Sequence, residues 1–218
     1  MALSETFCNA AAIMLLAATC VDFAIVYILA PFYSGYSHRK QVMSALGNPD
    51  SPVRVIYNIW LVILGLLLLV ASPLIYARFS GVSAGLSVTI VIFIDVFAVG
   101  AGVIAGIFSV NADKSVSTTA SKIHGASAAI GFMALLFVPL LIGILSFSQG
   151  DATEGVISIV SFAAALVFFT LFVMADKPEF KNTIIALEGL WQRLSLLFMY
   201  LPLAYLAART LIDNSTSA

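Results

Sequence analysis

Charged residues are scarce in this sequence. Only 10 % of its 218 residues are Asp, Glu, Lys or Arg, whereas 61 % are hydrophobic. A soluble domain carries roughly a quarter charged residues, so this chain could not cover itself with polar surface in water. The scarcity therefore excludes an ordinary soluble protein and predicts that lipid is its solvent over much of its area. The net charge of −1 also leaves no basic face for nucleic acid.

Residues that bind metals are few as well. There are two cysteines, Cys8 and Cys20, and two histidines, His38 and His124. Both cysteines lie in one apolar run, where a helix would hold them about 18 Å apart, which is too far for a disulfide. No group of residues has a metal-ligand spacing, so we expect neither a metal site nor a cofactor.

Long hydrophobic runs are what the sequence has in abundance. A membrane helix needs about 20 mostly apolar residues. Six stretches qualify, at about residues 7–32, 55–76, 86–108, 123–147, 156–174 and 190–208. Their separators are short and rich in Gly, Pro, Asp and Ser, which favour turns. The sequence therefore predicts an all-α polytopic membrane protein in which residues 1–218 form one bundle of six transmembrane helices.

The basic residues predict how this bundle is oriented. Eight of them lie in or beside the first, third and fifth connections: Arg39, Lys40, Arg54, Lys114, Lys122, Lys177, Lys181 and Arg193. Only Arg78 and Arg209 lie on the other side. Because Lys and Arg are retained on the cytoplasmic side, this asymmetry predicts that both termini are outside and that the protein resides in the cell (inner or plasma) membrane.

Two aspartates fall inside predicted spans, where lipid penalises charge. Asp22 lies near the middle of the first span and Asp95 near the middle of the third. Counting from the outer ends of their helices puts the two carboxyls within about 6 Å of the same depth. Such a pair would suit a proton relay or a cation site, because adjacent carboxylates share a proton. The alternative is that each aspartate separately bonds a polar side chain on a neighbouring helix.

A second polar group gathers where the second, fourth and sixth spans begin, at the cytoplasmic end. Its members are Arg54, Tyr57 and Asn58, then Lys122 and His124, and finally Glu188, Gln192 and Arg193. If the three helices converge, their N-termini and cationic groups would form a pocket for an anion. For Arg54 and Lys122 we favour simple snorkelling to water. The candidate ligand-binding residues are therefore Asn58, His124, Gln192 and Arg193.

Small and aromatic residues give packing signals. Gly102 and Gly106 form a GxxxG pair, which lets helix backbones approach closely in lipid. Aromatic rings near predicted span ends are typical of the membrane interface, and here they are Tyr33, Tyr57, Trp60, Tyr76 and Trp191.

Three short motifs point to a known family. Asn58 lies near the start of the second span, His124 is followed by Gly125 and Ala126 at the start of the fourth, and Gly-Leu-x-x-Arg-Leu covers Gly189 to Leu194. This pattern resembles the bacterial and archaeal membrane family catalogued as domain of unknown function number 998. The resemblance implies a six-helix fold and a bacterial membrane location, but it implies no activity. It does not extend to Asp22 or Asp95.

Three hypotheses for function follow. The first is a site for a lipid headgroup or small anion at the cytoplasmic end, held by His124 and Arg193 and oriented by Asn58. The second is a small proton- or cation-coupled transporter that uses Asp22 and Asp95. The third is an assembly subunit that docks another copy or a partner through the Gly102 face. A neutral His124 can act as a general base, but no nucleophile or metal is evident, so the sequence favours a binder over an enzyme.

Overall fold

Long helices make up most of the molecule. The computed structural model describes residues 4–113 and 115–217, and within these ranges it contains helices and turns but no strand. Five helical stretches are long and apolar enough to cross a membrane, namely Glu5–Phe32, Arg54–Ile107, Thr119–Ser148, Ala152–Ala175 and Glu188–Thr216. The protein is therefore a polytopic α-helical membrane protein, as its composition predicts.

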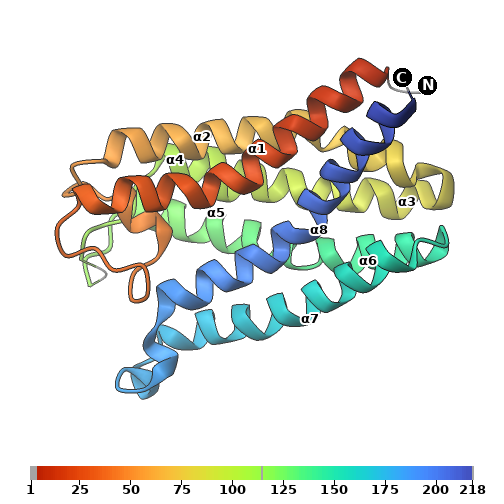
Figure 1. The fold of residues 1–218 in the computed structure, drawn as a ribbon. Coiled ribbons are helices and arrows are strands. Elements are labelled where there is room, and N and C mark those ends of the chain that lie inside the picture. The colour runs from red at the N-terminus through yellow and green to blue at the C-terminus, as the bar shows by residue number, and fades with distance from the viewer. Residues whose placement is uncertain (1–3, 114, 218) are drawn as a thin grey trace.

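The first and last helices meet at one end of the bundle (Figure 1). Helix α1 covers Glu5–Leu29 and continues into the short turn η1, Ala30–Phe32, while α8 covers Glu188–Ser217. Helix α8 runs past its predicted end at residue 208, and on this extension Arg209 pairs with Asp213 one turn later at 3.9 Å. Asn214 then donates a hydrogen bond to Asn9 of α1 at 2.7 Å, which joins the two ends.

The stretch from Arg54 to Ile107 folds back on itself. It comprises α2 (Arg54–Ala71), α3 (Pro73–Phe97), the π-helix η3 (Ala98–Ile104) and α4 (Ala105–Ile107). The only non-helical residue inside α3 is Ser83, with φ −156° and ψ 104°. A Cβ atom on Gly102 of η3 would lie 2.8 Å from Gly65 Cα of α2, so the two arms run side by side. The chain reverses direction where the sequence predicts a short turn between the second and third spans, and it does so with a single residue out of helical geometry.

The fourth predicted span is broken into two helices. Helix α5 covers Thr119–Leu136 and α6 covers Val138–Ser148. The break follows from Pro139, which has no N–H to continue the helical ladder. Gly150, at a positive φ of 83°, then turns the chain into α7, Ala152–Ala175.

The two ends of the bundle differ in charge. One end holds the longer connections, which contain the turns η2 (Met43–Gly47), η4 (Pro178–Phe180) and η5 (Ile184–Ala186) (Figure 1). Seven of the eight basic residues that the sequence assigns to one side lie in or beside these connections, and Lys114 lies outside the described residues. We call this the cation-rich end. At the opposite, terminal end, Arg78 pairs with Glu154 at 3.3 Å.

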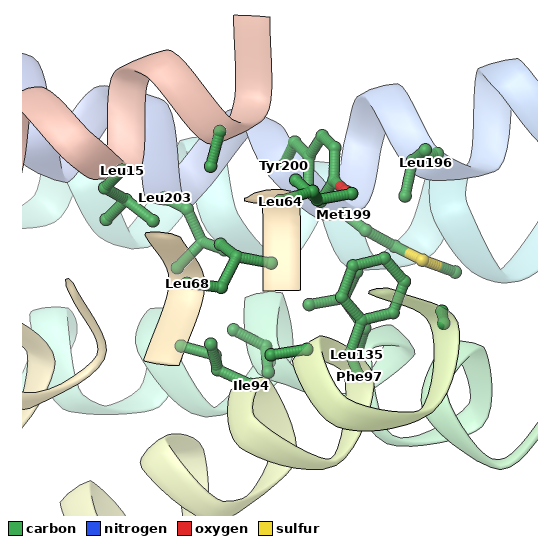
Figure 2. Packing of buried hydrophobic residues seen from close by; sticks show 14 of the residues in the cluster. Leu15, Leu64, Leu68, Ile94, Phe97, Leu135, Leu196, Met199, Tyr200 and Leu203 are labelled. Carbon is green, nitrogen blue, oxygen red and sulfur yellow. The ribbon is translucent and has the colours of Figure 1, made fainter. Parts of the chain in front are cut away.

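A layer of leucines closes the interior toward the terminal end. Leu15 of α1, Leu68 of α2 and Leu203 of α8 are each at most 1 % exposed and lie together in the core (Figure 2). On the outside of the bundle, by contrast, Ile59 and Val167 are 54 % and 57 % exposed. Apolar side chains on that outer surface are what a lipid environment requires.

Candidate functional site

A small polar cavity lies inside the bundle, between the leucine layer and the cation-rich end. Its volume is about 50 Å³, and we call it the chamber. Most of its wall is apolar. The polar groups come from five elements: Asp22 of α1, Ser44 of η2, Tyr57 of α2, His124 of α5 and Gln192 of α8. The fold thus collects a carboxyl, two hydroxyls, an imidazole and a carboxamide around one enclosed space.

Asp22 is the acidic group of the chamber, and it is 2 % exposed. Its Oδ1 accepts a hydrogen bond from Trp60 Nε1 of α2 at 3.0 Å, and its Oδ2 accepts one from the Tyr200 hydroxyl of α8 at 3.2 Å. Both partners are donors, so these bonds suit a carboxylate, and further lone pairs stay available for a proton or a water. Trp60 is thereby 9 % exposed and bonded to Asp22 inside the bundle.

His124 reaches the chamber from the first turns of α5, which begins with a capping box between Thr118 and Ser121. Its Nδ1 lies 3.1 Å from the Ala105 carbonyl oxygen and 2.8 Å from the Phe108 carbonyl oxygen. These carbonyls lack helical donors because α4 ends there. Two acceptors at Nδ1 place the proton on that atom, so the neutral ring keeps Nε2 as an acceptor.

The polar side chains of the chamber are bonded mainly to the surrounding backbone. Gln192 Oε1 accepts a hydrogen bond from Met43 N at 2.7 Å, and His124 bonds through Nδ1 to two carbonyl oxygens. Tyr57, which also lines the chamber, is 2 % exposed. Polar groups around an internal cavity are generally satisfied by water. The chamber therefore has the chemistry of a water-holding cavity.

Residues 36–47 cross the start of α8 and close the chamber at the cation-rich end, and we call this segment the strap. Arg193, which is 5 % exposed, holds it. The Arg193 Nη1 donates to the carbonyl oxygens of His38 and Gln41 at 2.7 and 3.0 Å, and Nη2 donates to the Tyr36 hydroxyl at 2.5 Å. The two terminal nitrogens of the guanidinium thus bind the strap, Nη1 also donates to the Gly189 carbonyl oxygen at 2.7 Å, and the buried Nε has no partner among the described residues. Arg193 is not among the residues that line the chamber.

Asn58 holds the far end of the strap. Its Nδ2 donates to the Gly47 carbonyl oxygen at 3.3 Å and to Ser109 Oγ at 3.0 Å, and Arg54 Nε also donates to that hydroxyl at 3.3 Å. Of the four candidate ligand-binding residues, the structure places His124 and Gln192 in the chamber. It places Asn58 and Arg193 in the bonds that fasten the strap over it.

Acid should loosen the strap. Burial, and then the Arg193 charge, lower the pKa of the half-buried His38 below its ordinary 6.5, while its ring stacks on Tyr27 and lies edge-on to Tyr36. His38 therefore binds a proton less readily in the closed strap than in the released strap. The stability that His38 gives to the closed strap is fully present above about pH 6.5, and it is lost as the pH falls through the lowered pKa of His38. We expect faster hydrogen exchange of strap amides at pH 5, relative to a His38→Gln variant at the same pH. Equal pH dependence in both proteins would contradict this assignment.

Asp95 does not share the chamber. It lines a separate groove of about 430 Å³ on the outside of the bundle, with Val99 of η3 and Ile130 of α5, and its Oδ1 has no hydrogen-bond partner among the described residues. The structure therefore separates the two aspartates that depth alone had grouped. Gly102 and Gly106 lie against α2 of the same chain, so the face considered for docking a partner is already covered.

Comparison with known proteins supplies the family. The model for "Protein of unknown function (DUF998)" matches residues 16–209. The chain belongs to the DUF998 family. No curated protein and no solved structure matches it significantly. All five polar residues of the chamber lie within the matched region, so the chamber is part of the domain that defines DUF998 in this chain.

The sequence left some residues of the site in this DUF998 protein unrecognised. Ser44 was treated as part of a connection, and Tyr200 as part of an apolar span, although its hydroxyl binds Asp22. For Tyr57 the sequence did contain a signal: Tyr57, Leu61 and Leu64 are spaced so that they share one face of a helix. In the structure all three line the chamber. For Ser44 no local signal exists, because the strap is positioned by contacts with the distant helix α8.

Proposed function

We propose that this DUF998 protein crosses the inner or plasma membrane of the cell six times, with both termini outside. The reversal at Ser83 supports two crossings by the Arg54–Ile107 stretch, which make six together with one crossing by each of the other four stretches. The bond between Asn9 and Asn214 supports an even number, because it keeps both ends of the chain together. The cation-rich end then faces the cytoplasm by the positive-inside rule.

We further propose that the protein takes up protons within the membrane and that Asp22 binds them. One observation carries this proposal: a single small cavity inside the bundle is lined by a carboxyl, an imidazole, a phenol and a carboxamide from four different helices. Ionisable groups are expensive in lipid and mark ion and proton pathways in membrane proteins. This is the second of the three sequence hypotheses, with His124 in the place of Asp95.

The size and charge of the chamber favour protons over an anion. A volume of about 50 Å³ has room for about three or four waters, at roughly 10–15 Å³ of such volume each, and none for a lipid headgroup. The carboxyl of Asp22 would repel an anion, and the N–H groups of Arg193 are directed at strap carbonyls. A metal cation of the hard type needs about six oxygen ligands, which is more than these side chains offer.

The groups of the chamber can move a proton in simple steps. A hydronium that enters the chamber gives its excess proton to His124 Nε2 and becomes a neutral water. The imidazolium passes the proton to the next water, and the hydronium so formed gives it to an Asp22 carboxylate oxygen, so that one proton enters and one is bound while the imidazole and the waters return to their neutral forms. The carbonyls at Nδ1 would stabilise the transient imidazolium, because they accept from its other N–H.

The leucine layer supports proton-coupled transport rather than an open pore. Leu15, Leu68 and Leu203 fill the core between Asp22 and the terminal end (Figure 2). An apolar layer without water interrupts a proton path. A proton held on Asp22 therefore leaves by the route it entered, unless the helices rearrange, and coupling to such a rearrangement is what a transporter requires.

Proton flux tests this function. In proteoliposomes that contain a pH-sensitive dye, a valinomycin-driven potassium gradient should slowly acidify the interior when the unmodified protein is present, because each proton crosses only when the helices rearrange. Asp22→Asn should reduce this flux to the level of empty vesicles, because the amide cannot take up the proton. His124→Gln should slow it roughly a hundredfold, the usual scale for loss of an acid–base group.

Asp95→Asn is the matched control, since it changes the same kind of residue in a neighbouring span but outside the chamber. Its flux should equal that of the parent. Parental flux from Asp22→Asn would end the proposal, and a selective loss in Asp95→Asn would move the pathway to the outer groove.

A further inference from the structure

A second polar cavity lies at the cation-rich end, and we call it the vestibule. Its volume is about 430 Å³. The strap, the start of α5 and the connection around Asn111 surround it, and Lys40, Ser121 and Lys122 contribute polar groups to its wall. It is therefore large and polar enough to hold water from the cytoplasmic side.

The vestibule and the chamber share walls. On α8, Glu188 lines the vestibule and Gln192, one turn later, lines the chamber. On α5, Lys122 lines the vestibule and His124 lines the chamber. Two helices thus contribute to both cavities from nearby residues, so only a thin partition separates them.

The strap forms that partition. Its residues divide between the two spaces, since Val42 and Ala45 line the vestibule while Met43 and Ser44 line the chamber. Met43 is 4 % exposed, and so it fills the passage with an apolar side chain. A flexible thioether of this kind can leave and refill a gap at low cost.

Gln192 connects the strap with the contents of the chamber. Its Oε1 accepts the hydrogen bond from Met43 N at 2.7 Å, and its side chain also lines the chamber. A change in the chamber that reorients this carboxamide therefore also weakens the bond that holds Met43. We refer to this hydrogen bond as the latch.

We infer that the chamber is loaded from the vestibule and that Met43–Ser44 is the gate, which Gln192 latches in the closed position. The inference rests on the proposed function for the identity of the loaded species, and it adds the route and the residue that controls it. Gln192 acts as a positioning residue, because it holds the gate rather than the proton. The leucine layer leaves no equivalent route from the terminal end.

Thiol accessibility tests the gate without measuring proton flux. Ser44→Cys, in a protein with Cys8→Ala and Cys20→Ala, should react slowly with a small cationic thiosulfonate, and only from the cytoplasmic side of oriented vesicles. Adding Gln192→Leu should raise the rate roughly tenfold, the factor that corresponds to the loss of one hydrogen bond. Gln192→Glu retains an acceptor for Met43 N and should keep the slow rate, which separates loss of the latch from general loosening.

Two further positions serve as references. Ala45→Cys lines the vestibule and should react fast whether or not the latch is present. Leu68→Cys lies in the sealed layer and should not react. Reaction of the Ser44→Cys thiol from the opposite side of the membrane would contradict the proposed gate. So would a reaction rate that stays the same when Gln192→Leu is added. The proposed function could fail separately, if gated access to that thiol were seen but Asp22→Asn carried parental proton flux.

Discussion

Replacing Arg193 with alanine should release the strap and lower the free energy of unfolding by roughly 2–4 kcal/mol, since each buried carbonyl that loses its donor costs about 1–3 kcal/mol. The carbonyls concerned belong to His38 and Gln41, whose oxygens lie 2.7 and 3.0 Å from Nη1. Each kcal/mol should lower the Tm by roughly 2–4 °C in a chain of this size. Thermal unfolding in detergent and hydrogen exchange of residues 36–47 measure the two effects.

Two variants calibrate this result. Lys122→Ala removes an exposed cation at the same end and should change the Tm little. Arg193→Lys keeps the charge but not the planar guanidinium that reaches several oxygens. Its Tm should therefore lie between the Tm values of Arg193→Ala and Lys122→Ala. If Arg193→Ala were as stable as Lys122→Ala, with unchanged exchange in the strap, the holding role of Arg193 would be refuted.

Gly102→Leu should disrupt the bundle more severely, with a loss of roughly 3 kcal/mol or more. A Cβ atom at this position would lie 2.8 Å from Gly65 Cα and 3.1 Å from the Leu61 carbonyl oxygen. Backbone atoms cannot move aside as side chains do, so α2 and η3 would separate. The expected result is a low yield of monodisperse protein and early thermal unfolding.

Gly85→Ala is the control for Gly102→Leu. No atom lies within 4 Å of a Cβ at Gly85, and alanine is favoured over glycine in helices by up to about 1 kcal/mol. This variant should therefore be as stable as the parent or slightly more stable. Normal unfolding of Gly102→Leu, with loss of a co-purifying protein only, would instead indicate that the glycine face docks a partner.

Hydrophobicity predicted most of the fold, because a membrane helix is a local property of about 20 consecutive residues. The first span, predicted at about 7–32, corresponds to Glu5–Phe32. The turn at Ser83 was predicted as well, because Gly81 and Gly85 beside it are typical of a connection between spans. The length of the connection was not predicted, since helical geometry continues on both sides of Ser83.

The candidate site was less predictable, because it depends on which helix faces meet. The depth of Asp22 and Asp95 in the membrane could be estimated from the sequence, but the direction in which each side chain points from its helix could not. In the structure, Asp22 lines the chamber and Asp95 lines the outer groove. Trp60 shows the same limit. Its position near a span end favoured the interface, whereas its partner, Asp22, is 38 residues away in the chain.

The polar motifs at the cation-rich end were easier to place. His124 and Gln192 were grouped because three helices begin with polar residues at one level, and both line the chamber. Arg193 follows Gln192 directly, yet successive residues point about 100° apart on a helix, so the two side chains serve different surroundings. Sequence spacing therefore located the region of the site and not the division of roles within it.

Infrared difference spectroscopy of the purified protein during a pH titration tests the central claim most directly, because the carbonyl band of a protonated carboxyl reports proton uptake itself. The proposal predicts a band from a buried carboxyl that disappears in Asp22→Asn and persists in Asp95→Asn. A band that survives Asp22→Asn unchanged, or no titrating buried carboxyl in the parent protein, would contradict proton binding in the chamber.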